Sequence, residues 1–134
     1  MQADHITWEP RYSVHVDEID AQHQELFSTV NHLIDLHADN SGELYPVLKR
    51  LVDYLSRHFR TEQKLMIEMG YPDLARHMRE HQLFTEKVQE FLGQYREQDK
   101  KLIRSMLFFL RHWIQSHTTT IDMKYADYLK NKGE

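Results

Sequence analysis

The sequence predicts an all-α protein, an up-down-up-down antiparallel four-helix bundle preceded by an N-terminal arm. Apolar residues recur at steps of three and four in four separate stretches, which is the periodicity of amphipathic helices. Glycine and proline number only four and three, and they fall mainly between these stretches. The 134 residues suit one compact domain. We therefore expect a single domain over residues 1–134, in which short loops join antiparallel neighbours.

The first sixteen residues show no clear period, and we expect an ordered arm over residues 1–16. Trp8, Tyr12 and Val14 give this arm apolar side chains that can pack against the bundle. The first helix is predicted over about 17–38, and a turn with the sequence DNSG follows at Asp39 to Gly42. The apolar stripe of this helix comprises Ile19, Leu26, Phe27, Val30, Leu33 and Ile34.

The second and third helices are separated by the sequence GYPD. The second is predicted over about 43–69, with Pro46 in its first turn, where a missing N–H is tolerated, and with Gly70 as its C-terminal stop. The third is predicted over about 73–93. Their stripes comprise Leu44, Val47, Leu48, Leu51, Leu55, Phe59, Leu65, Met66 and Met69 in the second helix, and Leu74, Met78, Phe84, Val88, Phe91 and Leu92 in the third.

The fourth helix is predicted over about 99–130, after the apolar pattern lapses between Gly93 and Asp99. Its stripe comprises Leu102, Ile103, Met106, Leu107, Leu110, Trp113, Ile114, Ile121 and Tyr125. At about 1.5 Å per residue, the four helices would be roughly 30–40 Å long. They would thus enclose one continuous interior between them.

The composition limits the possible partners. A net charge of −4 argues against nucleic acid or an anionic membrane surface as the main partner. The absence of cysteine excludes disulfides and thiolate chemistry. The most apolar stretch, IRSMLFFLRHWI, is too short and too charged to span a bilayer, and the first residues lack the basic and apolar regions of a signal peptide. We therefore expect a cytoplasmic protein.

Ten histidines are an unusually large number for this length. Five of them, together with one carboxylate, share a helix face with the predicted core: His23, His58, His77, His81, His117 and Glu62. A single histidine on an apolar face is more often a hydrogen-bonded core residue than a metal ligand. The remaining five are expected to be solvated or to cap helices: His5, His15, His32, His37 and His112.

Convergence of the five histidines from four helices favours a metal site. An isolated buried carboxylate is strongly destabilising or becomes neutral, and a cation removes that penalty while using the imidazole lone pairs. Residues four apart on a helix are close enough to chelate one ion, as with His77 and His81 or with His58 and Glu62. Imidazole ligands without sulfur suit zinc, copper, iron or nickel. Five histidines exceed the needs of one tetrahedral ion, so two ions are expected.

Four segments carry these residues: QHQELF around His23, HFRTE at 58–62, HMREH at 77–81, and HWIQSHTTTID with His117 and Asp122. The combined pattern resembles the hemerythrin family, specifically its single-domain bacterial members, and the resemblance covers essentially the whole chain. It implies a non-haem centre of two iron ions inside the bundle. It also implies that this centre binds O2 reversibly, for oxygen transport or storage, and that the protein is not an enzyme.

The resemblance further implies a role for each site residue. The implied ligands are His77, His81 and His117 on one iron, His23 and His58 on the other, and Glu62 and Asp122 as bridges beside an oxo or hydroxo group. The iron with two histidines would keep one coordination position open. Phe59, Trp113 and Ile114 would form the apolar wall of the O2 pocket.

The implied ligands His117 and Asp122 lie five residues apart, which on a regular α-helix rotates them by roughly 140°. Both can approach the same ions only if the helix is loosened between them, as in a π-bulge, or if Asp122 approaches from the side. The intervening sequence TTT is a mediocre helix former. We therefore expect a local irregularity between His117 and Asp122.

Other functions stay open at this point. A sensor of oxygen, redox state or nitric oxide, or an iron-handling protein, would use the same ligands as an oxygen carrier. The segment HMREH also fits the zinc-protease signature H-x-x-E-H, with Glu80 as general base. That alternative would leave His23, His58 and His117 unexplained, and the chain is short for a protease. Any enzyme partner that consumes O2 is unidentified.

Overall fold

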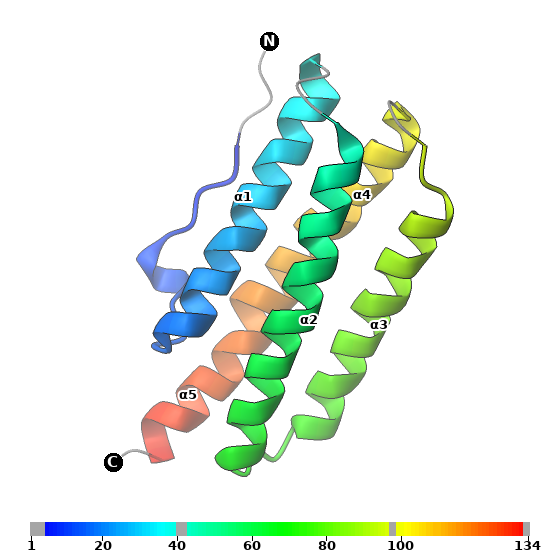
Figure 1. Cartoon of the computed structure of the whole chain (residues 1–134). Coiled ribbons are helices and arrows are strands. Elements are labelled where there is room, and N and C mark those ends of the chain that lie inside the picture. Colours follow the sequence, from blue (N-terminus) through cyan, green and yellow to red (C-terminus); the bar gives the residue numbers. More distant parts are fainter. Residues whose placement is uncertain (1–4, 40–42, 97–98, 133–134) are drawn as a thin grey trace.

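Four long helical segments run alternately up and down and pack side by side (Figure 1). The computed structural model describes residues 5–39, 43–96 and 99–132. After a short 3-10 helix, η1 (Pro10–Tyr12), the elements are α1 (Asp17–Asp39), α2 (Leu44–Glu68), α3 (Leu74–Gly93), α4 (Lys100–Trp113), the π-helical stretch η2 (Ile114–Ile121) and α5 (Asp122–Lys132). The predicted all-α four-helix bundle is therefore confirmed. Among the described residues, no helix combines the length and the apolar character that crossing a membrane requires.

The helices begin and end within two residues of the predicted positions. Gly70 stops α2 as predicted, because its φ of 64° is left-handed and the next N–H, of Tyr71, donates to the carbonyl of Met66 at 3.0 Å. The carboxylate of Asp99 caps α4 by accepting from the N–H of Leu102 at 3.0 Å. Most of the predicted DNSG turn, and the first four residues of the predicted arm, lie outside the described residues.

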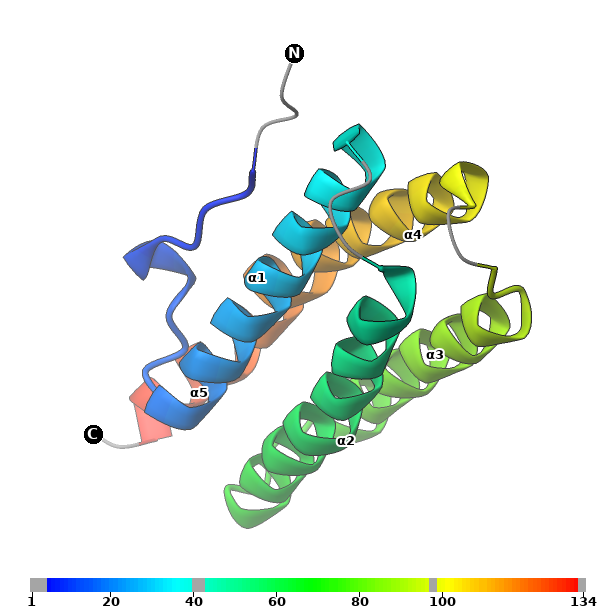
Figure 2. The ribbon, with the colours of Figure 1, turned by 45° about the horizontal axis from the view of Figure 1, so that its top comes forward.

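The N-terminal arm runs beside α1, as both views of the ribbon show (Figures 1 and 2). Trp8 and Tyr12 are partly buried against the core, and Val14 is fully buried. Asp20 holds the junction with α1, because its carboxylate accepts from the Ser13 hydroxyl at 2.5 Å and from the Val14 N–H at 2.8 Å. The arm is thus an ordered part of the bundle, as its apolar residues predict.

Two apolar clusters fill the bundle. The larger includes Leu26, Phe84 and Trp113, and the smaller includes Ile19 and Met66. Along α1, α2 and the last helical segment, the chain passes from one cluster to the other through histidine and carboxylate side chains that are themselves buried. The fold therefore encloses a polar layer between two apolar clusters.

Candidate metal centre

Seven buried ionisable side chains form this polar layer. Each is at most 2 % exposed. They are His23 on α1, His58 and Glu62 on α2, His77 and His81 on α3, His117 on η2, and Asp122 at the start of α5. The structure therefore brings together all seven residues named from the sequence, and the other five histidines stay outside the buried core.

The seven side chains divide into two groups that share one carboxylate. The groups are Glu62, His77, His81 and His117, and His23, His58, Glu62 and Asp122, with the candidate ligand atoms of each group within 4.8 Å of one another. Neither group contains Glu80, on which the protease alternative depends. Each of the two groups could hold a cation, and the two groups are adjacent.

Asp122 presents one carboxylate oxygen to each group of histidines. Its Oδ1 lies 2.9 Å from Nε2 of His77 and 3.0 Å from Nε2 of His117. Its Oδ2 lies 3.0 Å from Nε2 of His23. One carboxylate thus faces both histidine groups with different oxygens.

Glu62 approaches both groups with a single oxygen. Its Oε1 lies 2.9 Å from Nε2 of His58, which belongs to one group. The same oxygen lies 3.1 Å from Nε2 of His81 and 3.8 Å from Nε2 of His77, which belong to the other. Glu62 and Asp122 therefore lie between the two groups of imidazoles.

The π-helical geometry of η2 explains how Asp122 reaches this position. The N–H of Asp122 donates to the carbonyl of His117, five residues earlier. This wider turn brings residues five apart onto one side of the helix, where a regular α-helix would separate them by roughly 140°. The predicted irregularity between His117 and Asp122 is therefore confirmed, and its effect is to direct both side chains inward.

Neighbouring imidazoles keep the two buried carboxylates ionised. Burial by itself raises the pKa of Glu62, but the charge of His58 and its contact with the carboxylate hold this pKa well below its usual range. Burial and the charge of Glu62 raise the pKa of Asp122. The contacts with His117 and His23 lower it by more, so the pKa of Asp122 lies well below its usual value. The polar layer is therefore built to balance positive and negative charge.

We expect the metal-free protein to be most stable near pH 6.5. Burial lowers the pKa of His77, but contacts with Asp122 and Glu62 outweigh burial and raise it to about 9. This contribution to stability is fully present below pH 6.5 and is lost as the pH rises through 9. Burial lowers the pKa of His81 to about 4, so its contribution is lost as the pH falls from 6.5 towards 4.

Urea unfolding of the metal-stripped protein at a series of pH values measures this dependence. A free energy of unfolding that stays level between pH 6.5 and 9 would contradict the raised pKa of His77. The variant His77→Gln, which cannot titrate, should flatten the alkaline part of the profile and keep the acidic part. Some alkaline slope should remain, because burial lowers the pKa of His23 but contact with Asp122 raises it overall.

The atoms of the polar layer fit a pair of cations. In octahedral coordination, neighbouring ligand atoms about 2.1 Å from a shared ion lie about 3.0 Å apart. The closest N–O distances here are 2.9–3.1 Å. Four buried atoms of the layer make no well-directed hydrogen bond within the described residues: Nε2 of His23, Nε2 of His117 and both oxygens of Asp122. Buried polar atoms without such a bond need another partner. Imidazoles with carboxylates are a donor set that suits iron.

Gln22 supports the site from α1, and its role was not predicted from the sequence. Its Oε1 accepts from Nδ1 of His58 at 2.8 Å, and its Nε2 donates to the hydroxyl of Thr61 at 3.2 Å. With the Nδ1 proton held by Gln22, Nε2 of His58 is the nitrogen that faces the site, where it can offer its lone pair to a bound cation. No spacing rule identifies such a glutamine, since its partner lies on another helix.

Replacing Gln22 with leucine should weaken iron binding by about 10–100-fold, because the orientation and tautomer of His58 lose their support. Competition with a chelator measures the affinity. Gln24→Leu, two residues along on the exposed side of α1, is the matched control and should bind iron normally. Equal affinity in the two variants would show that Gln22 does not orient His58.

Aromatic rings cover two of the imidazoles. Phe59 stacks on His81 with ring centroids 3.7 Å apart, and Trp113 stacks on His117 at 3.9 Å. Ile114 is buried beside them at the start of η2. Phe59 and Trp113 thus lie directly against the group of three histidines, and Ile114 belongs to the same apolar cluster as these two rings.

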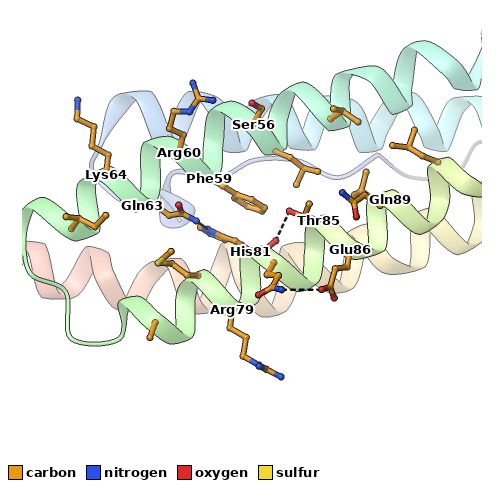
Figure 3. A pocket seen from close by; sticks show the side chains of 18 of the residues that line it. Ser56, Phe59, Arg60, Gln63, Lys64, Arg79, His81, Thr85, Glu86 and Gln89 are labelled. Atoms are coloured by element: carbon orange, nitrogen blue, oxygen red, sulfur yellow. Dashed lines mark hydrogen bonds between the residues drawn. The ribbon is translucent and has the colours of Figure 1, made fainter.

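Two further polar side chains lie at the edge of the site. Tyr54 stacks on His58, and burial raises the pKa of its phenol well above the usual value. Gln63 lies in an open groove between α2 and α3, where its amide nitrogen is 3.4 Å from Nδ1 of His81 (Figure 3). His81 also lines this groove, so the groove reaches one imidazole of the site.

Comparisons with known proteins agree with this geometry. Residues 14–129 match the family described as Hemerythrin HHE cation binding domain. The chain is 31% identical over 128 residues to a bacteriohemerythrin of Stenotrophomonas maltophilia, covering 93% of this chain and 82% of that protein. It is 29% identical to a bacteriohemerythrin of Clostridium acetobutylicum, covering 91% and 99%, and 29% identical to a hemerythrin-like protein of Naegleria gruberi, covering 92% and 93%. A bundle with this buried histidine and carboxylate layer, matched over nearly its whole length, belongs to the hemerythrin family.

Proposed function

We propose that this protein binds O2 reversibly at a non-haem centre of two iron ions, for oxygen transport or storage. The observation that carries the proposal is the position of Asp122, which faces one histidine group with each of its oxygens. A carboxylate in this position could serve an ion in each of the two groups. Membership of the hemerythrin family supports iron as the metal.

The proposed ligand set follows the two groups. His77, His81 and His117 would hold one ion, and His23 and His58 would hold the other. Glu62 and Asp122 would serve both ions, beside an oxo or hydroxo group. The group of two histidines would supply fewer protein ligands and so would leave room for O2 on that side. When bound, a pair of ferrous ions supplies the electrons that reversible O2 binding requires.

The protein's own side chains favour binding over oxidation chemistry. Neutral imidazoles outnumber carboxylates in the site, so highly oxidised iron gains little stabilisation from them. Water and protons that entered the site would leave it oxidised. Their entry is hindered by the buried side chains of Phe59, Trp113 and Ile114. These two properties are those of a carrier rather than an enzyme.

Anaerobic reduction followed by exposure to air tests the proposal. We expect a visible charge-transfer band that appears with air, disappears under vacuum and returns over repeated cycles. Zinc-loaded protein is the control, because zinc has no redox chemistry. The absence of a band from protein that holds iron would remove the O2-binding function. A band that bleaches permanently in the first cycle would favour redox sensing.

A further inference from the structure

The outer side of α4 carries a basic stripe with an exposed aromatic ring in it. Lys101, Arg104, Phe108 and Arg111 follow one another at steps of three or four and so share one face of the helix. Phe108 is 78 % exposed, more than any other large apolar side chain in the described residues. These four residues are called the α4 face below.

Shallow hollows flank Phe108 on both sides. The hollow toward α1 is lined in part by Ile34 and Leu107. The hollow toward α3 is lined in part by Phe109 and Lys87. None of the described residues that line either hollow is acidic. Both hollows therefore offer apolar floors with positively charged edges.

The charge of the α4 face contrasts with that of the rest of the protein. α4 contains four positive side chains and no negative one, so the remainder of a chain with net charge −4 carries −8. Some basic residues elsewhere pair with acids, as Arg57 does with Glu25 at 2.8 Å and Lys87 with Glu90 at 3.5 Å. Arg104 and Arg111 have no such ion pair within the described residues. Their charge is therefore available to an outside partner.

A row of packed rings connects this surface with the polar layer. Phe109 lines the hollow toward α3, and its ring lies 5.2 Å from that of Phe84. The ring of Phe84 lies 4.4 Å from that of Trp113, which stacks on His117 at 3.9 Å. A partner seated on the α4 face is thus linked to a candidate iron ligand by side chains in direct contact.

We propose that the α4 face docks an acidic one-electron carrier protein that reduces the site. Carboxylates of the carrier would pair with Arg104 and Arg111, and an apolar side chain would cover Phe108. Opposite charges accelerate encounter, and protein–protein interfaces are enriched in arginine and aromatic side chains, the two kinds that the α4 face combines. The inference rests on the proposed two-iron function. Two dockings, each with one reduced carrier, deliver the two electrons that convert an oxidised site to its reduced form and leave two oxidised carriers.

An acidic iron–sulfur ferredoxin is the probe, titrated against iron-loaded protein by calorimetry at low and moderate salt. Exchanging both arginines, Arg104→Glu with Arg111→Glu, should raise the Kd at least about tenfold and slow reduction by ferredoxin in parallel. Phe108→Ser should also weaken binding, but with an unchanged salt dependence. The matched control is Arg60→Glu with Lys64→Glu, which makes the same charge change on the exposed side of α2 and should bind normally.

An equal loss of affinity in both double variants would show that net charge alone attracts the carrier, and would overturn the docking face. The docking face is also overturned if the natural protein fails to bind ferredoxin at low salt, or if Arg104→Glu with Arg111→Glu binds as before. The band that forms in air separates this inference from the proposed function. Chemically reduced variants that still show the reversible band leave O2 binding intact whatever the ferredoxin result.

Discussion

Replacing Asp122 with asparagine is expected to lower bound iron from the two ions per chain that we propose to fewer than one. The two oxygens of Asp122 face opposite histidine groups, at 2.9–3.0 Å from His77, His117 and His23. Asparagine offers one oxygen, and its NH2 group donates hydrogen bonds instead of a lone pair. It also removes a negative charge that offsets the charge of two cations. Both ions should therefore lose affinity together.

Elemental analysis of the purified variant after desalting measures this effect. Asp127→Asn, which changes an exposed carboxylate on the same helix, is the matched control and should keep its iron. Circular dichroism should show a largely helical protein in both variants, because the two apolar clusters on either side of the site stay complete. Full iron loading of Asp122→Asn would contradict a bridging carboxylate at this position.

Replacing Trp113 with alanine is expected to lower the free energy of unfolding by about 3–5 kcal/mol. Trp113 is 5 % exposed and belongs to the larger apolar cluster. Its ring packs against Phe84 and stacks on His117, so truncation leaves a cavity that touches both the core and the site. The same cavity should admit water beside His117 and shorten the lifetime of the O2-binding form.

Urea unfolding of the metal-stripped protein separates the packing effect from any effect on iron binding. Phe108→Ala removes another aromatic ring from α4, but one that is 78 % exposed. This control should change the free energy of unfolding by no more than about 0.5 kcal/mol. If Trp113→Ala lost as little as the control, the ring would have no structural role at the site.

Much of the fold could be predicted from local patterns in the chain. Helical periodicity depends on neighbours three and four residues apart, so the observed helix ends lie close to the predicted ones. The stop at Gly70 is equally local, because a left-handed φ is a property of one residue. The last segment was predicted as one helix, and the structure divides it into α4, η2 and α5. Only the need to direct both His117 and Asp122 inward indicated that a regular helix would fail there.

Helical spacing alone indicates that five histidines and Glu62 face the interior, because it sets the side of the helix on which each residue lies. Which atoms contact one another depends on the folded arrangement. Three contacts depend on packing or on local backbone geometry. They are the contact of each Asp122 oxygen with a different histidine group, the hydrogen bond of Gln22 to His58, and the stacking of Trp113 on His117. Distances between side chains depend on how helices pack and on where one of them widens, and no repeat within a single helix carries that information.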